Sequence, residues 1–127
     1  MCEHMKKAVI ILGHGSKRQE ANAELDKIVE SLAERHADWL IQKAYAEFAE
    51  PTLEQAVGLL ARQGIGEIVL VPFFLTLGNH LHKNLPDRMK RLAQIYPEVV
   101  CVQAEHLGCD TLLVQLIEKR IAEADER

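Results

Sequence analysis

Four of the six histidines in the sequence stand shortly after apolar segments that have the composition of β-strands, and two glutamates close a further such segment. Because the carboxyl ends of parallel strands meet at one edge of a sheet, we expect these side chains to gather there. Imidazole and carboxylate groups bind divalent cobalt, nickel and iron, and a neutral imidazole also accepts protons near neutral pH. The pattern therefore predicts a metal site with nitrogen and oxygen ligands, drawn from His14, Glu47, Glu50, His80, His82 and His106.

The stretch "GHGS" places His14 between two glycines at the end of an apolar run. Gly13 and Gly15 leave the imidazole accessible and let the backbone approach a large ligand. The stretch lacks the third glycine of a dinucleotide fingerprint, the Gly-Lys of a P-loop and the second glycine of a nucleophile elbow. His14 is therefore a candidate functional residue. A loop residue without function, and a flavodoxin-like module that binds phosphate or a nucleotide through this loop, are the alternatives.

Four segments have the pattern of buried strands. They are residues 8–12, 39–48, 67–74 and 99–104, which are short, apolar and rich in β-branched residues. The second is less apolar than the others, which favours a place nearer the edge of the sheet. Helix-like segments alternate with these strands in the order βαβαβαβα. This order predicts an α/β fold, a three-layer sandwich with a four-stranded parallel sheet and helices on both faces, as in half of a flavodoxin-like domain.

The helices are indicated by apolar residues at helical spacing and by local start signals. Ser16 heads a sequence that predicts a capping box, and Pro51 suits the first turn of the second helix. The third helix is expected to open near Pro86, so that the histidines before it lie in an extended connection. The last helix is expected to begin at Cys109 or Asp110.

Composition excludes several classes of protein. The 127 residues, 48% of them apolar and 27% charged, suit one domain spanning the whole chain. A net charge of −4 argues against a general nucleic-acid or membrane-surface binder, and no apolar run is long enough to span a membrane. Three cysteines without zinc-finger or CxxC spacing, and no visible secretory signal, predict a cytoplasmic protein. Residues 1–6 are expected to form a flexible tail, with accessory metal ligation by Cys2 and His4 as the alternative.

Four motifs together resemble the small, single-domain CbiX-type sirohydrochlorin chelatases of the class II chelatase family. They are "LGHGSKRQEAN", "AYAEFAEPTLEQAV", "VPFFLTLGNHLHKNLP" and "LGCDTLLVQLIEKR", which follow one another in the family's order over nearly the whole chain. The resemblance implies a chelatase-like fold, a homodimer, and insertion of a divalent metal into sirohydrochlorin without ATP or another nucleotide. Cobalt is the expected metal substrate, with nickel or iron as alternatives.

The resemblance also assigns roles to single residues. His14 and His80 match the family's metal-binding and catalytic histidines, and Glu47 matches the acidic residue that accompanies them. Asn84 departs from the pattern, because the family usually has aspartate there. His82 stands where a basic residue is common, which implies a contact with a substrate carboxylate rather than with the metal.

A substrate with many carboxylates needs local positive charge on an acidic protein. Basic side chains and backbone N–H groups near the two histidine loops could supply it. These candidate substrate-binding residues are Gly13, Gly15, Ser16, Lys17, Arg18, His82, Lys83 and Arg88. A planar tetrapyrrole is too wide for one such domain to enclose, so two copies related by a twofold axis are expected to build the cleft. A metal or tetrapyrrole carrier of the same fold, without turnover, is the alternative to an enzyme.

Overall fold

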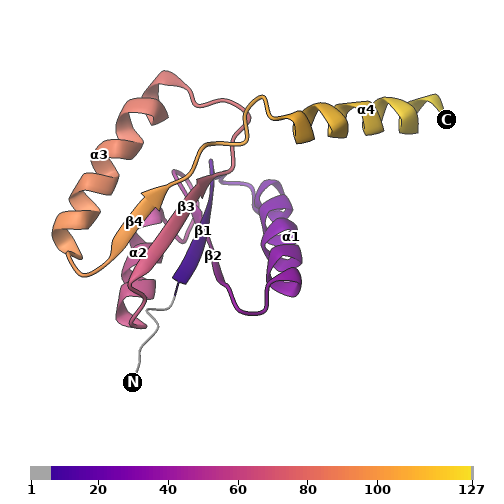
Figure 1. Cartoon of the computed structure of the whole chain (residues 1–127). Helices are drawn as coiled ribbons and strands as arrows, with labels where there is room; N and C mark the ends of the chain where they lie inside the picture. Colours follow the sequence, from indigo (N-terminus) through magenta and orange to yellow (C-terminus); the bar gives the residue numbers. More distant parts are fainter. Residues whose placement is uncertain (1–6, 127) are drawn as a thin grey trace.

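A computed structural model describes residues 7–126 and has the predicted α/β organisation (Figure 1). Residues 1–6, which include Cys2 and His4 and for which a flexible tail was expected, lie outside the described residues. The elements alternate along the chain as β1 (Lys7–Gly13), α1 (Gln19–Arg35), β2 (Leu40–Tyr45), α2 (Leu53–Arg62), β3 (Glu67–Pro72), α3 (Asn79–Ile95), β4 (Val100–Gln103) and α4 (Thr111–Asp125).

The four strands form one parallel sheet in the order β2-β1-β3-β4, which confirms the edge position expected for β2. Gly13 at the end of β1 pairs with Tyr45 of β2, and Leu12 pairs with Pro72 of β3. The order of the strands reverses between β1 and β3. Loops that leave the carboxyl ends of two such strands diverge and open a crevice, which is where ligands bind in open α/β sheets. The loops in question carry His14 and lead to His80.

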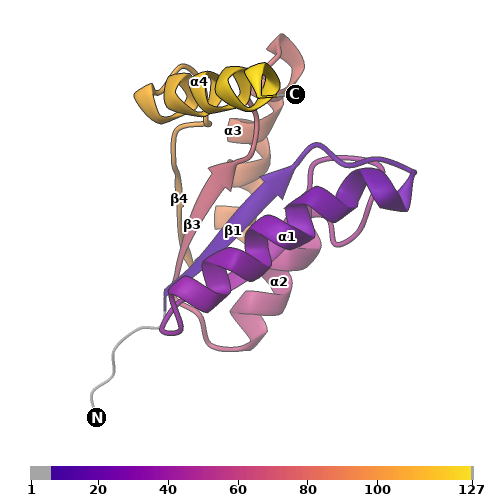
Figure 2. The same cartoon turned by 90° about the vertical axis from the view of Figure 1, so that its right-hand side faces the viewer.

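Successive residues of the central strands enter different hydrophobic clusters. Ile10 and Leu12 pack with the apolar residues of α2 and α3, whereas Ile11 packs with Leu25 of α1. Helix α1 thus covers one face of the sheet and α2 and α3 cover the other, as Figures 1 and 2 show. Each fully buried side chain of this kind stabilises the fold by about 1.5–3 kcal/mol. The two packed faces hold the ends of the central strands in fixed positions.

Helix α4 extends away from this body (Figure 1), and none of its residues is buried. It begins as predicted, because the carboxylate of Asp110 accepts a hydrogen bond from the Leu112 N–H at 2.9 Å. Its apolar side chains are open to solvent, with Leu112 72% and Ile121 57% exposed. Within residues 7–126, neither α4 nor any other helix is long and apolar enough to cross a membrane. The cytoplasmic location stays a prediction.

The start of α1 differs from the prediction. The helix begins at Gln19, and the residue before it, Arg18, makes no side-chain capping bond. The side chain of Asn22 instead reaches back to Ser16, accepting a hydrogen bond from its N–H at 3.1 Å and donating one to its carbonyl at 3.0 Å. The predicted capping box headed by Ser16 was therefore wrong. The Asn22 side chain bonds both the N–H and the carbonyl of Ser16, and the helix begins only at Gln19.

The start of α3 was also placed wrongly. The helix begins at Asn79 and includes Pro86, so His80 and His82 lie in its first turn rather than in an extended connection. Proline removes only its own N–H, and the carbonyl left without that partner belongs to the exposed His82, where water can reach it. Residues two apart on a helix differ in direction by about 200°, so these two histidines point to different sides of α3.

The second helix begins just after Pro51, the residue expected in its first turn. Pro51 lies before α2, and Thr52 caps the helix. The Thr52 hydroxyl accepts a hydrogen bond from the Gln55 N–H at 3.1 Å, and the Gln55 side chain accepts one from the Thr52 N–H at 2.8 Å. Pro51 therefore predicted the start of α2 to within two residues.

Candidate functional site

The His14 loop is held against the loop that follows β2. Beyond the last paired residues, the Ala46 N–H donates to the Gly13 carbonyl at 2.9 Å, and the Glu47 N–H donates to the His14 carbonyl at 3.0 Å. Gly15 follows with φ at +98°, and a Cβ atom placed on it would lie 1.7 Å from the Glu47 carbonyl oxygen. Strand pairing thus continues past the sheet edge and places Glu47 beside the backbone of His14.

His80 reaches Glu47 from another element. It lies in the first turn of α3, and its Nε2 atom lies 3.5 Å from Oε1 of Glu47. The imidazole is 74% exposed and the carboxylate 33% exposed, so a partly sheltered acid faces an accessible ring. The pair thus brings one nitrogen and one oxygen donor together at the carboxyl edge of the sheet. Their role as metal ligands stays a prediction.

His14 is exposed and its ring lies among aromatic side chains. Its centroid is 6.5 Å from that of Phe48 and 6.1 Å from that of Phe74. Across residues 7–126, no three histidine, cysteine or acidic side chains are placed closely enough to hold a metal ion together. The structure therefore joins Glu47 and His80 directly, with His14 as their neighbour through the backbone. The His14 side chain is exposed, and exposed side chains change rotamer within nanoseconds.

The remaining candidate ligands lie elsewhere. His82 points to another side of α3. His106 lines a hollow of about 460 Å³ against α4 rather than the crevice beside His14. Glu50 accepts a hydrogen bond from the Gln55 side chain at 3.3 Å. The candidate site thus reduces to two histidines and one glutamate.

Arg88, expected to bind a substrate carboxylate, is engaged within the fold. Its guanidinium donates to both carboxylate oxygens of Glu54 at 2.7 Å and to the Ala46 carbonyl at 3.2 Å, and its side chain is only 11% exposed. The hydrogen bonds from Arg88 hold the pKa of the Glu54 carboxyl below its ordinary value, although partial burial acts in the opposite direction. Arg88 therefore ties α3, which carries His80, to the backbone next to Glu47.

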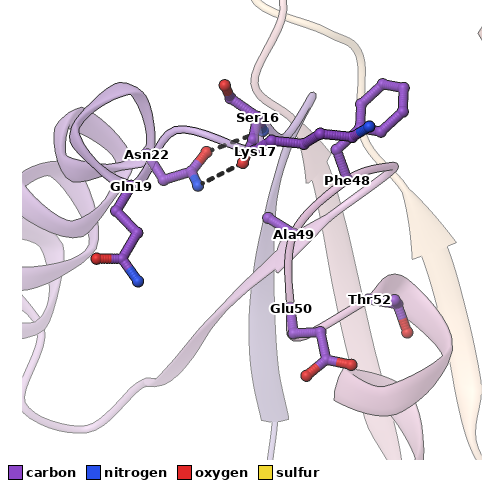
Figure 3. A pocket seen from close by; sticks show the side chains of 8 residues that line it. All are labelled: Ser16, Lys17, Gln19, Asn22, Phe48, Ala49, Glu50 and Thr52. Atoms are coloured by element: carbon purple, nitrogen blue, oxygen red, sulfur yellow. Dashed lines mark hydrogen bonds between the residues drawn. The ribbon is translucent and has the colours of Figure 1, made fainter.

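Lys17 and Arg18 do lie beside His14. With Gly15, Ser16 and Phe48 they line a hollow of about 410 Å³ that includes the His14 imidazole. A larger hollow of about 590 Å³ adjoins it, and Figure 3 shows its lining. That larger hollow includes none of His14, Glu47 and His80, whereas the smaller one includes His14. The two hollows share Ser16, Lys17 and Phe48, which form a common wall.

Phe48 is the residue that sequence reasoning missed. The sequence places it at the end of a strand over 39–48, but β2 ends at Tyr45 and Phe48 stands in the loop, 60% exposed. No local pattern distinguishes an aromatic residue that ends a strand from one that follows it. The position of Phe48 beside His14 follows from the backbone hydrogen bonds between the loops after β1 and β2.

Comparison with known proteins gives one family for the chain. The family model described as CbiX matches residues 8–124. The chain is 32% identical, over 126 residues, to the sirohydrochlorin cobaltochelatase of Methanosarcina acetivorans, covering 94% of this chain and 97% of that protein. It is also 32% identical, over 113 residues, to the chloroplastic sirohydrochlorin ferrochelatase of Arabidopsis thaliana, covering 89% of this chain but only 50% of that protein.

A solved structure has the same fold. The putative cobalamin biosynthesis CbiX protein from Marinobacter aquaeolei superimposes with a TM-score of 0.84 at 32% identity, covering 95% of this chain and 98% of that one. The chain therefore corresponds to the whole of two relatives and to half the length of a third. The two named chelatases differ in the metal that their names specify.

Proposed function

The chain belongs to the CbiX family, and we propose that it is a sirohydrochlorin chelatase, a lyase-class enzyme that inserts a divalent metal ion into sirohydrochlorin without a nucleotide. The observation that carries this proposal is the contact of His80 with Glu47 beside the His14 loop. It stands in a chain that matches a named cobaltochelatase over almost its full length. We propose cobalt as the metal substrate, with nickel or iron as alternatives.

Insertion exchanges one divalent ion for two pyrrolic protons. We propose that His14, His80 and Glu47 replace part of the ion's hydration shell and present it to the macrocycle. Imidazole and carboxylate ligands hold such ions but also release them, whereas thiolates would favour trapping. A neutral imidazole accepts one pyrrolic proton and the Glu47 carboxylate accepts the other. The partly sheltered position of Glu47 keeps it close to His80 for this purpose.

Substrate carboxylates need positive charge and open backbone near this site. We propose that Lys17 and Arg18 supply that charge, since both line the hollow that contains His14. Lys83, exposed near the start of α3, would add positive charge, and His82, on another side of that helix from His80, would contact a more distant substrate carboxylate. Gly13, Gly15 and Ser16 let the macrocycle approach the backbone.

The test is an anaerobic absorbance assay. Sirohydrochlorin is mixed with Co²⁺, Ni²⁺ or Fe²⁺ with and without the protein, and the spectral change of metal insertion is followed. We expect the protein to raise the rate of insertion well above the protein-free rate for at least one ion. A protein that binds the ions or the macrocycle without raising that rate would be a carrier instead.

We also propose that the protein works as a homodimer joined through α4. This helix carries an exposed apolar face, formed by Leu112, Leu116, Ile117 and Ile121. The Arabidopsis relative is about twice as long as the matched segment, so it has room for a second such unit in one chain. A second copy of this chain would cover the face that α4 leaves open, and two copies would build a cleft wide enough for the macrocycle.

The dimer can be tested by sedimentation equilibrium at micromolar protein. We expect the wild type to have twice the mass of one chain and the double variant Leu112→Glu/Ile117→Glu to have the mass of one, because four buried charges cannot be accommodated in an apolar interface. The matched control is Gln115→Glu/Lys119→Glu, which adds the same residues to polar positions of α4 and should leave the mass unchanged. A monomeric wild type would contradict the proposal.

A further inference from the structure

Phe48 has an unfavourable conformation and an unfavourable environment at once. Its φ is +63°, the left-handed region that favours glycine and asparagine, and within residues 7–126 it is the only residue other than glycine with a positive φ. The ring is also 60% exposed, so little of its apolar surface is removed from water by the fold. Residues held in such conformations cluster at binding and catalytic sites. Neither the core nor the local backbone accounts for phenylalanine here.

The surroundings of Phe48 connect it to the site. It follows Glu47 in the chain, its ring centroid lies 6.5 Å from that of His14, and the Lys17 ammonium lies over the ring, 5.7 Å from its centroid. Figure 3 shows the Lys17 side chain extending toward this ring. The ring also forms part of the wall shared by the two hollows. An apolar surface, a cation and the candidate metal-handling side chains therefore stand next to one another.

We propose that the ring of Phe48 is the surface against which the tetrapyrrole stacks, and that the exposed Lys17 side chain moves from over the ring to bind a peripheral carboxylate. This inference rests on the proposed function, because it names the residue that positions the macrocycle of that same reaction. An aromatic ring gains from offset stacking on a flat conjugated ligand, beyond the apolar area it buries. Stacking here places the macrocycle within reach of the His14 ring. Covering Phe48 also removes its exposed apolar surface from water, which accounts for a phenylalanine at a position with this backbone conformation.

The experiment measures binding without turnover. Metal-free sirohydrochlorin is titrated anaerobically into EDTA-treated protein, and the change in macrocycle absorbance gives Kd. Phe48→Leu keeps an apolar side chain but removes the ring, and we expect it to raise Kd about tenfold. Phe48→Asn removes the ring and suits a positive φ, so we expect the same loss of affinity with a Tm about 2–4 °C higher than that of the wild type. Phe48→Tyr keeps the ring and should stay within about threefold of the wild type.

The control is Trp39→Leu, which removes another exposed aromatic ring, one that stacks on His36 before β2 begins, at the opposite edge of the sheet from the site. It should leave Kd unchanged. Wild-type affinity in Phe48→Leu and Phe48→Asn would overturn the inference, as would a Tm lowered by Phe48→Asn, since that would mark a structural residue. If the wild type inserts metal and Phe48→Leu has an unchanged KM, only this inference fails. If the wild type does not bind sirohydrochlorin at all, the proposed function fails with it.

Discussion

His14→Ala and His80→Ala are each expected to lower the rate of catalysed metal insertion about 100-fold or more, as the loss of a positioned general base does. Each variant also loses one nitrogen ligand of the proposed set. Both side chains are exposed, His80 to 74%, so the substitutions remove no core packing and the fold should be retained. The measurement is the anaerobic insertion assay with each metal, accompanied by a thermal melt to show that stability is unchanged.

His36→Ala is the matched control for these two variants. His36 lies at the end of α1, where its ring stacks on Trp39 with centroids 3.7 Å apart, and it has no place in the site. We expect its insertion rate to match that of the wild type. Full activity in His80→Ala would contradict the proposed ligand set. Phosphate binding unaffected by the same variant, in a wild type without insertion activity, would support the phosphate-binding interpretation of "GHGS".

The strands and the edge on which the site lies could be predicted from the sequence because they depend on local composition. A short β-branched run such as Ile10 to Leu12 is buried on both faces in any parallel sheet, and the alternation of strands with helices fixes which ends meet. His14, Glu47 and His80 all follow such strands, so their approach to one edge was predictable without knowledge of any contact.

The contacts that orient the site were not predictable, because they join residues far apart in the chain. Arg88 and Glu54 pair across 34 positions, and nothing in either local sequence marks the partner. Sequence reasoning therefore assigned Arg88 to the substrate, whereas the structure has it bracing the backbone beside Glu47. The start of α3 was missed for a different reason. Pro86 ordinarily indicates a first turn, but here the rest of the helix packs well enough to tolerate it.

The last helix shows the limit of periodicity. Apolar residues at helical spacing predicted α4 and its start correctly, but the same spacing could not indicate what the apolar face packs against. In a single copy that face is open, since Leu112 and Ile117 are 72% and 52% exposed. The periodicity thus predicts that this face is buried, and the proposed second copy of the chain would bury it.

Gly15→Ala is expected to destabilise the fold by about 2–4 kcal/mol and to abolish most of the insertion activity that remains in the folded fraction. The added Cβ would stand 1.7 Å from the Glu47 carbonyl oxygen, a backbone atom that cannot move aside alone. The two loops must therefore separate, which breaks the hydrogen bond from the Glu47 N–H to the His14 carbonyl and moves Glu47 away from His14. Urea unfolding measures the loss of stability, and the insertion assay measures the loss of activity under conditions where the variant is folded.

Gly64→Ala is the control that separates the effect of the close contact at Gly15 from the effect of a positive φ. Gly64 also has a positive φ, +84°, but a Cβ there would meet nothing within 4 Å. Its replacement should cost only the conformational penalty, about 1–2 kcal/mol, with activity unchanged. The difference between their losses in free energy of unfolding is then the cost of separating the His14 loop from Glu47. Equal destabilisation by both, with activity retained in Gly15→Ala, would mean that this close approach does not hold the site together.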